Sequence, residues 1–330
     1  MKISFVEPHL ELFGGIRRII ELSNRLIKLG ESVTIYHPAG TPCEWMECAA
    51  LVKPLSTLVA DSHDAVIFND PPHYRIVRRT RAPLKVFYVL GLYERERLKR
   101  FSLKILWPKK GRVMSIKRIL QLPFLKITNA TWMQRFLADE MGVHAELVIG
   151  GVNRNVFHPV ATERTPGEFR ILASGDPREY KGMDSVKEAV NMVRRGHPGV
   201  VLDTYHGRGI AQERMAEIYS SADLFVDMQW NTGCGWNNPV AEAMACRVPV
   251  ICSDIGGVQD FAIDQETAIL VPERDPRRLA AEIVRLLERA DLRTRIASNG
   301  YEKIIRFDWD ASAAALQRIL REKYASCGRS

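Results

Sequence analysis

The stretch "ISFVEPHLELFGGIRRIIELSNRLIKLGESVTIYH", residues 3–37, places one helix pattern between two strand patterns. Residues 3–8 and 32–37 are rich in β-branched and aromatic side chains, which is typical of strands. Residues 16–30 repeat Ile and Leu at helical spacing and end on a glycine, which commonly closes a helix. Two strands joined by a helix predict a βαβ unit, and therefore a parallel sheet.

The same alternation recurs along the chain in two series. Further strands are predicted at 64–70, 84–91, the start of 125–142, 168–176 and 200–205, and further helices at the end of 125–142 and at 182–195. Near 151–168 the periodicity stops, which marks a connection between domains. We therefore expect an α/β protein of two Rossmann-like domains, residues 1–155 and 156–330.

Composition places the chain among soluble globular enzymes, with 46% hydrophobic and 26% charged residues in a length of 330. No run approaches the roughly 18 apolar residues of a membrane-spanning helix, and the first residues form a strand rather than a signal peptide. The cysteines lack the spacing of a disulfide framework or a metal site, which favours a reducing compartment. They are Cys43, Cys48, Cys234, Cys246, Cys252 and Cys327. We expect a cytoplasmic protein.

Positive charge is concentrated between residues 75 and 118, which hold fifteen Lys and Arg against Glu94 and Glu96. This basic segment carries a net charge of +13, so the rest of the chain carries −5 to give the total of +8. Leu, Ile, Phe and Trp are interleaved with the charges, a composition that suits an anionic membrane surface. A solvated insertion with a few core residues explains it equally well. We expect no nucleic acid as a partner, because no nucleic-acid-binding motif accompanies the charge.

The stretch "GCGWNNPVAEAMA", residues 233–245, joins a loop rich in glycine and asparagine to a helix. It follows a strand predicted at 222–228, and open parallel sheets bind ligands beyond the carboxyl ends of their strands. We expect Asn238 to cap a helix that begins at Pro239, where a missing N–H costs nothing. Free backbone amides and the helix dipole would favour a diphosphate there. Glu242 either accepts hydrogen bonds from ligand hydroxyls or only stabilises the helix dipole.

The C-terminal half resembles the retaining glycosyltransferases of family 4, which have the GT-B fold. The resemblance covers nearly all of 148–309 and rests on "VIGGVNRNVFHP", "REYKGMDSVKEAV", "YSSADLFVDMQW", "NNPVAEAMACRVPVICSDIGG", "TAILVPERDPRRLAAEIVRLL" and "NGYEKIIRFDW". The N-terminal half is similar in its first strand, in "FGGIRR" and in the helix that follows, and then diverges. The resemblance implies two parallel sheets facing across a cleft, with the last helix, about 308–325, packing back on the N-terminal domain.

The resemblance implies a role for each matching residue. Residues that would bind the donor diphosphate are Gly14, Gly15, Arg178, Lys181 and Asn238. Glu242 matches the second glutamate of the family's E-x7-E element and would hold the ribose. The donor sugar would contact Cys234, Gly235, Trp236 and Asn237. Each assignment has an alternative that involves no ligand. Arg178 and Lys181 would then be an exposed pair of cations, and Gly14 and Gly15 would only close an ordinary strand-to-helix turn.

Two positions depart from the family pattern. Cys234 stands where the first glutamate of E-x7-E is expected, and a thiol cannot supply the charged acceptor that grips sugar hydroxyls. The N-terminal histidine often found near the fourth strand is missing from "YVLGLYERE", residues 88–96. Glu94, Asp70 and His73 are the remaining candidates for a catalytic role in that domain, although Glu94 also fits a surface position.

The activity implied is transfer of a hexose from a nucleoside diphosphate sugar to a hydroxyl of a glycan or lipid-linked glycan, with retained configuration. No metal or other cofactor is expected, because cations and backbone amides could stabilise the leaving group. Relatives that act on lipid-linked acceptors suggest a peripheral position on the inner face of the plasma membrane. A catalytically weak nucleotide-sugar-binding scaffold subunit is the alternative. A Rossmann dehydrogenase would require G-x-G-x-x-G after the first strand, and "EPHLELFGG" does not provide it.

Overall fold

The computed structural model describes residues 1–92, 110–230 and 233–327. The chain divides into two compact units, unit 1 from Met1–Gly150 with Trp309–Ser330, and unit 2 from Gly151–Asp308. The division follows Gly150, a few residues before the expected boundary at 155, and the last helix belongs to unit 1. Glu94 and residues 93–109 of the basic segment lie outside the described residues.

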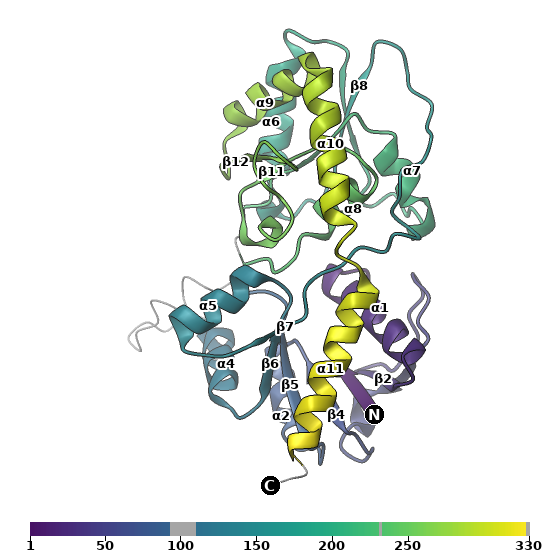
Figure 1. Cartoon of the computed structure of the whole chain (residues 1–330), viewed down its shortest axis with the longest axis vertical. Coiled ribbons are helices and arrows are strands. Elements are labelled where there is room, and N and C mark those ends of the chain that lie inside the picture. The colour runs from purple at the N-terminus through teal and green to yellow at the C-terminus, as the bar shows by residue number, and fades with distance from the viewer. Residues whose placement is uncertain (93–109, 231–232, 328–330) are drawn as a thin grey trace. The chain divides into compact units, whose positions relative to one another are not determined.

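The described part of unit 1 is built on a seven-stranded parallel sheet in the order β3-β2-β1-β4-β5-β6-β7 (Figure 1). Its strands are β1 (Lys2–Val6), β2 (Ser32–His37), β3 (Leu51–Pro54), β4 (Ala65–Phe68), β5 (Leu84–Val89), β6 (Leu125–Thr128) and β7 (Glu146–Leu147). Phe5 of β1 lies opposite Ile35 of β2 and Ile67 of β4. The predicted βαβ unit and its parallel sheet are confirmed.

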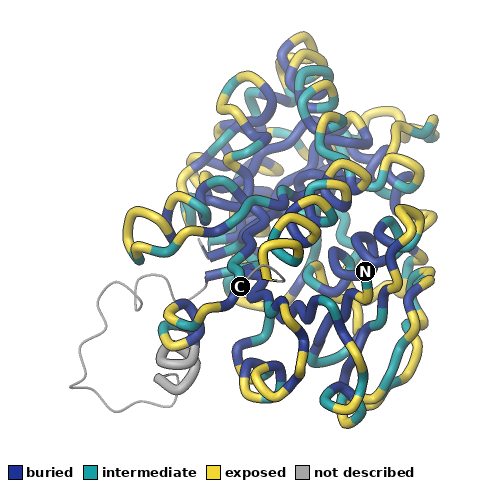
Figure 2. The backbone as a smooth tube through the Cα atoms, turned by 60° about the horizontal axis from the view of Figure 1, so that its bottom comes forward, coloured by how far each residue is buried: buried dark blue, intermediate teal, exposed yellow. Residues whose placement is uncertain are grey.

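Helices cover both faces of this sheet, because successive residues of a strand point to opposite sides. Phe5 and Ile67 belong to one apolar cluster, whereas Val6 and Phe68 belong to the other. The helical elements are α1 (Gly14–Lys28), η1 (Leu55–Thr57), η2 (Pro71–His73), α2 (Tyr74–Val77), α4 (Lys110–Gln121), α5 (Thr131–Met141) and α11 (Trp309–Cys327). Figure 2 shows the buried residues mostly along inner stretches of the backbone and the exposed ones mostly on outer turns.

Helix α11 packs on α1, as Figure 1 shows, and completes the first of these clusters. Leu316 and Leu320 are fully buried there, and the guanidinium of Arg18 lies 4.9 Å from the ring centre of Trp309. Glu31 accepts hydrogen bonds from Gln317 at 2.7 Å and from Arg321 at 2.9 Å. These apolar and polar contacts hold the end of the chain to unit 1.

Unit 2 contains a five-stranded parallel sheet among its described residues, in the order β12-β11-β10-β8-β9. The strands are β8 (Phe169–Ala173), β9 (Val200–Thr204), β10 (Leu224–Asp227), β11 (Val250–Ser253) and β12 (Ile269–Val271). The helical elements are η3 (Glu179–Lys181), α6 (Met183–Arg194), η4 (Gln212–Arg214), α7 (Met215–Ser220), α8 (Asn238–Ala245), η5 (Gly256–Val258), α9 (Pro276–Glu288) and α10 (Ala290–Ile304). Helices α6 and α9 pack on each other through the buried Val190 and Ile283.

Each sheet reverses its strand order at one place, between β1 and β4 in unit 1 and between β8 and β10 in unit 2. Crossover helices leave such a position in opposite directions, so the carboxyl ends of the two strands are open to a ligand. The fold therefore points to two places where side chains can meet a substrate, one in each unit. Among the described residues, none of the helices has both the length and the apolar character needed to cross a membrane.

Candidate functional site

Arg178 follows β8, at the strand reversal of unit 2. Its guanidinium donates from Nε to both carboxylate oxygens of Asp176, at 3.0 Å each. Burial raises the pKa of Asp176, but hydrogen bonds and charge from Arg178, with the charge of Lys181, bring it below its usual value. Asp176 is therefore a carboxylate that fixes the direction of Arg178, whose side chain remains 43% exposed.

Lys181 lies at the same strand reversal and bridges to the neighbouring strand. Its ammonium donates to Oε1 of Gln229 at 2.7 Å, and Gln229 follows β10. Gly182 makes this approach feasible, because it has φ +67° and a Cβ there would lie 2.0 Å from the carbonyl oxygen of Met228. The "YKG" sequence thus places a cation between the carboxyl ends of β8 and β10.

The thiol of Cys234 is turned into the protein. Its Sγ donates to the carbonyl oxygen of Trp236 at 3.4 Å, and a Cβ on Gly257 would lie only 3.1 Å from it. Burial raises the pKa of the Cys234 thiol despite the nearby charge of Lys181. Cys234 is therefore a neutral, closely packed, half-buried group, and Gly235 beside it is buried.

Trp236 and Asn237 are also buried in unit 2. The Trp236 ring packs against Phe261 and Phe307, with ring centres 4.7 and 5.4 Å apart. Asn237 caps α8, since its side chain accepts from the backbone N–H of Val240 at 3.3 Å. The prediction that Asn238 is the cap is wrong by one residue, because Asn238 is the first helical residue and Pro239 the second. The side-chain nitrogens of Trp236 and Asn237 are buried and have no hydrogen-bond partner among the described residues.

Glu242 lies one turn into α8 and is 7% exposed. Its Oε2 accepts a hydrogen bond from the hydroxyl of Tyr219 at 3.0 Å. Tyr219 is fully buried, and burial together with the charge of Glu242 raises the pKa of its hydroxyl well above the usual value. A neutral phenol therefore holds the carboxylate, which leaves Glu242 oriented by the protein before any ligand binds.

In unit 1, Gly14 and Gly15 are the first two residues of α1, which follows the loop after β1. A Cβ on Gly15 would meet only Leu90, at an ordinary 3.5 Å. An alanine at position 15 would therefore fit inside unit 1 without a steric clash. Gly14 is exposed and is the first residue of this helix.

Asp70 precedes the short η2 that follows β4 at the strand reversal of unit 1, and His73 is the last residue of η2. Burial lowers the pKa of His73, an effect that the charge of Asp70 only partly reverses. The Nδ1 atom of His73 is buried and has no hydrogen-bond partner among the described residues. Asp70 and His73 thus come together, whereas the third candidate, Glu94, lies outside the described residues.

Glu7 is the residue that sequence reasoning missed. It follows β1 directly, is 1% exposed, and both its carboxyl oxygens accept from Nδ2 of Asn69 at 2.8 Å. Burial, with a smaller contribution from Asp70, raises the pKa of Glu7 to about 8 although the bond from Asn69 opposes this. Glu7 carries a protonated carboxyl at neutral pH. The available signal was a glutamate at the end of the strand predicted at 3–8, together with "ND" at the end of the strand predicted at 64–70.

The sequence and structure of the chain are similar to those of known glycosyltransferases. Residues 155–289 match the family Glycosyl transferases group 1. A D-inositol 3-phosphate glycosyltransferase of Xylanimonas cellulosilytica is 29% identical over 162 residues, which cover 47% of this chain and 36% of that protein. The aligned part thus spans little more than a third of that relative.

Two solved structures share the fold over almost the whole chain. A sucrose-phosphate synthase from Thermosynechococcus elongatus has a TM-score of 0.78 at 19% identity, covering 98% of this chain and 99% of that one. Anabaena HepE in complex with UDP-glucose has a TM-score of 0.71 at 15% identity, covering 99% and 100%. Residues 155–289 thus match the glycosyl transferases group 1 family, and the two units have the parallel-sheet α/β fold of the GT-B glycosyltransferases.

Proposed function

We propose that the chain is a retaining glycosyltransferase, which moves a hexose from a nucleoside diphosphate sugar to a hydroxyl of a glycan or lipid-linked glycan. The observation that carries this proposal is the pair of cations, Arg178 and Lys181, at the strand reversal of unit 2. Both are held by buried polar side chains, Asp176 and Gln229 respectively. The family match of residues 155–289 and the UDP-glucose bound by HepE support the same donor class.

The two cations suit the charge that develops on the leaving diphosphate. A guanidinium binds phosphate oxygens in pairs, and an ammonium adds a compact positive charge. The N-terminus of α8, after Asn237, contributes backbone donors and the positive end of the helix dipole. Fixed donors of this kind stabilise a leaving group without reorganising during the reaction. We therefore propose that no metal ion is needed for departure of the nucleoside diphosphate.

Glu242 is proposed to hold the ribose hydroxyls of the donor. Its carboxylate accepts from Tyr219 on one oxygen, and a carboxylate has lone pairs for further donors. Because Tyr219 already orients the side chain, little conformational entropy is lost when a hydroxyl pair binds.

The acceptor is proposed to bind at the strand reversal of unit 1, beyond β1 and β4. Glu7 and His73 both lie near Asp70 there, and a protonated carboxyl and a neutral imidazole can donate to and accept from a hydroxyl group. Action at the cytoplasmic face of an anionic membrane, where the basic segment would meet lipid phosphates, belongs to the same proposal.

The decisive experiment incubates the protein with a panel of UDP-, GDP-, ADP- and dTDP-sugars and measures both melting temperature and release of nucleoside diphosphate. A donor should raise the melting temperature, because only the folded chain binds it. It should also be turned over when an acceptor glycan is supplied, and the anomeric configuration of the product should match that of the donor. A panel in which no nucleotide sugar binds would exclude the proposal.

Cys234 favours a second candidate, a nucleotide-sugar-binding scaffold with weak catalysis. Its neutral thiol, bonded to the Trp236 carbonyl, replaces a charged acceptor for sugar hydroxyls. In the same panel this candidate would show a rise in melting temperature without release of nucleoside diphosphate.

A further inference from the structure

Four arginines surround an open cavity of about 460 Å³ in unit 1, and none of the residues that line it is assigned above to the donor or the acceptor. The described residues that line it are Tyr74, Arg75, Arg78, Arg79 and Arg118. This volume is within the ~300–1,000 Å³ of small-ligand sites, but the lining is basic rather than apolar. The cavity thus has the size of a ligand site and the charge of an anion site.

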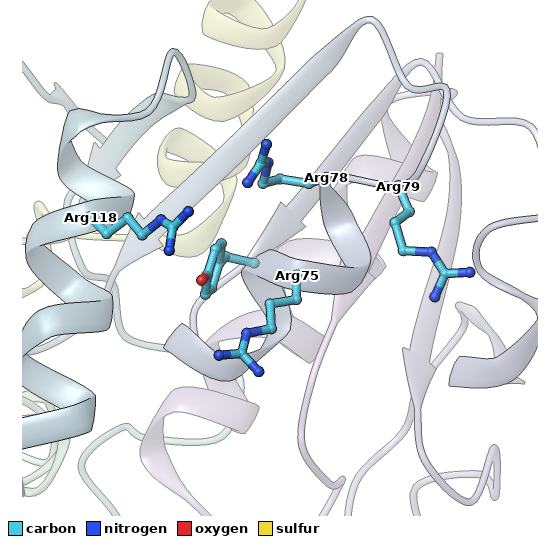
Figure 3. A pocket seen from close by; sticks show the side chains of 5 residues that line it. Arg75, Arg78, Arg79 and Arg118 are labelled. Atoms are coloured by element: carbon cyan, nitrogen blue, oxygen red, sulfur yellow. The ribbon is translucent and has the colours of Figure 1, made fainter.

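The cavity is held open by the packing of two elements that are far apart in the sequence. Tyr74 and Val77 of α2 share a buried cluster with Ile116 and Ile119 of α4. This shared core fixes Arg75 and Arg78 on one side and Arg118 on the other. Figure 3 shows Arg78 and Arg118 reaching toward each other, with Arg75 beside them, whereas Arg79 points away.

None of these four arginines has an acidic partner among the described residues. Elsewhere in the described chain many guanidinium groups pair with carboxylates, as Arg178 does with Asp176 and Arg289 with Asp291. Arginines gathered without a counter-ion repel one another, so their arrangement is unfavourable until an anion binds. Guanidinium groups donate hydrogen bonds in pairs, a chemistry that suits the oxygens of a phosphate group.

Tyr74 reports the resulting electrostatic field. A hydrogen bond with Arg75 and the charges of Arg118, Arg75 and Arg78 lower the pKa of its hydroxyl, although burial opposes this. The side chain is 6% exposed, so its ring belongs to the core while its hydroxyl faces the arginines. A phenol in this position can donate to an anion that the guanidinium groups attract.

We propose that Tyr74, Arg75, Arg78 and Arg118 form a binding site for a phosphate ester, separate from the donor diphosphate site of unit 2. The ester phosphate would lie between Arg78 and Arg118, and the remaining volume would take part of the group attached to it. A soluble sugar phosphate and a lipid headgroup share this chemistry. The site goes beyond the proposed sugar transfer, and it can be tested without any sugar donor.

The first arm titrates inorganic phosphate into the full-length protein by calorimetry, with saturating UDP present to occupy the donor site. The double variant Arg78→Ser/Arg118→Ser should weaken phosphate binding at least about tenfold, because it loses two charge-assisted contacts. Tyr74→Phe keeps the buried ring and should weaken binding by a smaller factor. The matched control is Arg81→Ser/Arg135→Ser, which removes the same charge from exposed positions of unit 1 and should bind phosphate normally.

The second arm distinguishes the two sources of phosphate, using sedimentation with phosphatidylcholine vesicles that contain phosphatidic acid. Loss of sedimentation in Arg78→Ser/Arg118→Ser, but not in the control, identifies a lipid headgroup. Equal sedimentation of both variants, with phosphate binding lost only in the first, identifies a soluble phosphate ester. The proposal is overturned if wild-type protein does not bind phosphate saturably, or if the control double variant loses as much affinity as the site variant. Melting temperatures of all variants establish that each remains folded.

Discussion

The ammonium of Lys181 lies 2.7 Å from Oε1 of Gln229, which joins the loops that follow β8 and β10. Gln229 is 1% exposed, and its backbone N–H donates to the side chain of Asp227. Burial and this hydrogen bond hold in place the residue whose side-chain oxygen accepts from Lys181. A flexible lysine is thereby held at the strand reversal before a ligand arrives. Less entropy is then lost on binding than for a lysine that is free in solvent.

Replacing Lys181 should therefore weaken the donor site without unfolding the protein. Lys181→Ala removes a charged hydrogen-bond donor, which corresponds to about 1.5–3 kcal/mol of donor binding or turnover, or roughly tenfold to a hundredfold. Donor titrations and initial rates measure the effect. Lys187→Ala, on the exposed face of α6, is the matched control and should behave like wild type. Unchanged donor kinetics in folded Lys181→Ala would show that Lys181 does not bind the donor.

Gly182→Ala should impair the same site through the backbone. Alanine at φ +67° costs about 1–3 kcal/mol, and its Cβ would clash with the carbonyl oxygen of Met228. We expect a lower melting temperature of unit 2 and weaker donor binding, because relief of the clash moves Lys181 away from Gln229. Gly196→Ala is the control, since its Cβ would meet nothing within 4 Å and its φ is not positive. Similar melting temperatures for the two variants would contradict this account.

Much of unit 2 could be predicted from the sequence, because the residues that determine each of its strands and helices are neighbours in the sequence. The strand before "REYKG" and the helix after "NNP" each depend on residues within a few positions of one another. The helix cap was misplaced by one residue because Asn237 and Asn238 have the same chemistry, and only the backbone angles select Asn237 as the cap.

The contacts in unit 1 depend on residues that are far apart in the sequence. Glu7 meets Asn69 only because β1 and β4 pair, and Arg118 reaches Arg78 only because α2 and α4 share a core. A carboxyl group's burial, which shifts the pKa of Glu7, is a property of the folded sheet and has no local signature.

Glu242→Gln separates ligand binding from helix stabilisation. Glutamine keeps the shape and one acceptor oxygen for Tyr219 but loses the negative charge that ribose hydroxyls would use. Donor affinity should fall about tenfold, measured by calorimetry with UDP or another matching nucleotide, whereas the melting temperature should change little. Glu188→Gln, an exposed glutamate of α6, is the control. A fall in stability with unchanged nucleotide affinity would show that Glu242 serves the helix alone.

Glu7 should make the stability of unit 1 fall as the pH rises. In the folded chain its pKa is about 8, above the usual value of 4.5, so the folded state holds a proton that the unfolded state releases. Its favourable contribution is therefore complete below the unfolded pKa and is lost progressively as pH rises toward 8. Glu7→Gln has no charge to bury, so it should escape this loss.

The measurement is the melting temperature of wild type and Glu7→Gln between pH 4 and pH 9, values that bracket the titration from about 4.5 to about 8. The variant should gain on wild type until the pH reaches about 8 and then keep a constant difference, because wild type alone must ionise a buried carboxyl that is hydrogen-bonded only to Asn69 among the described residues. Glu11→Gln changes an exposed glutamate of the same loop, and its difference from wild type should stay constant with pH. Parallel pH profiles for Glu7→Gln and wild type would mean that the Glu7 carboxyl is already ionised in the folded protein, and would remove it as a proton donor to an acceptor hydroxyl.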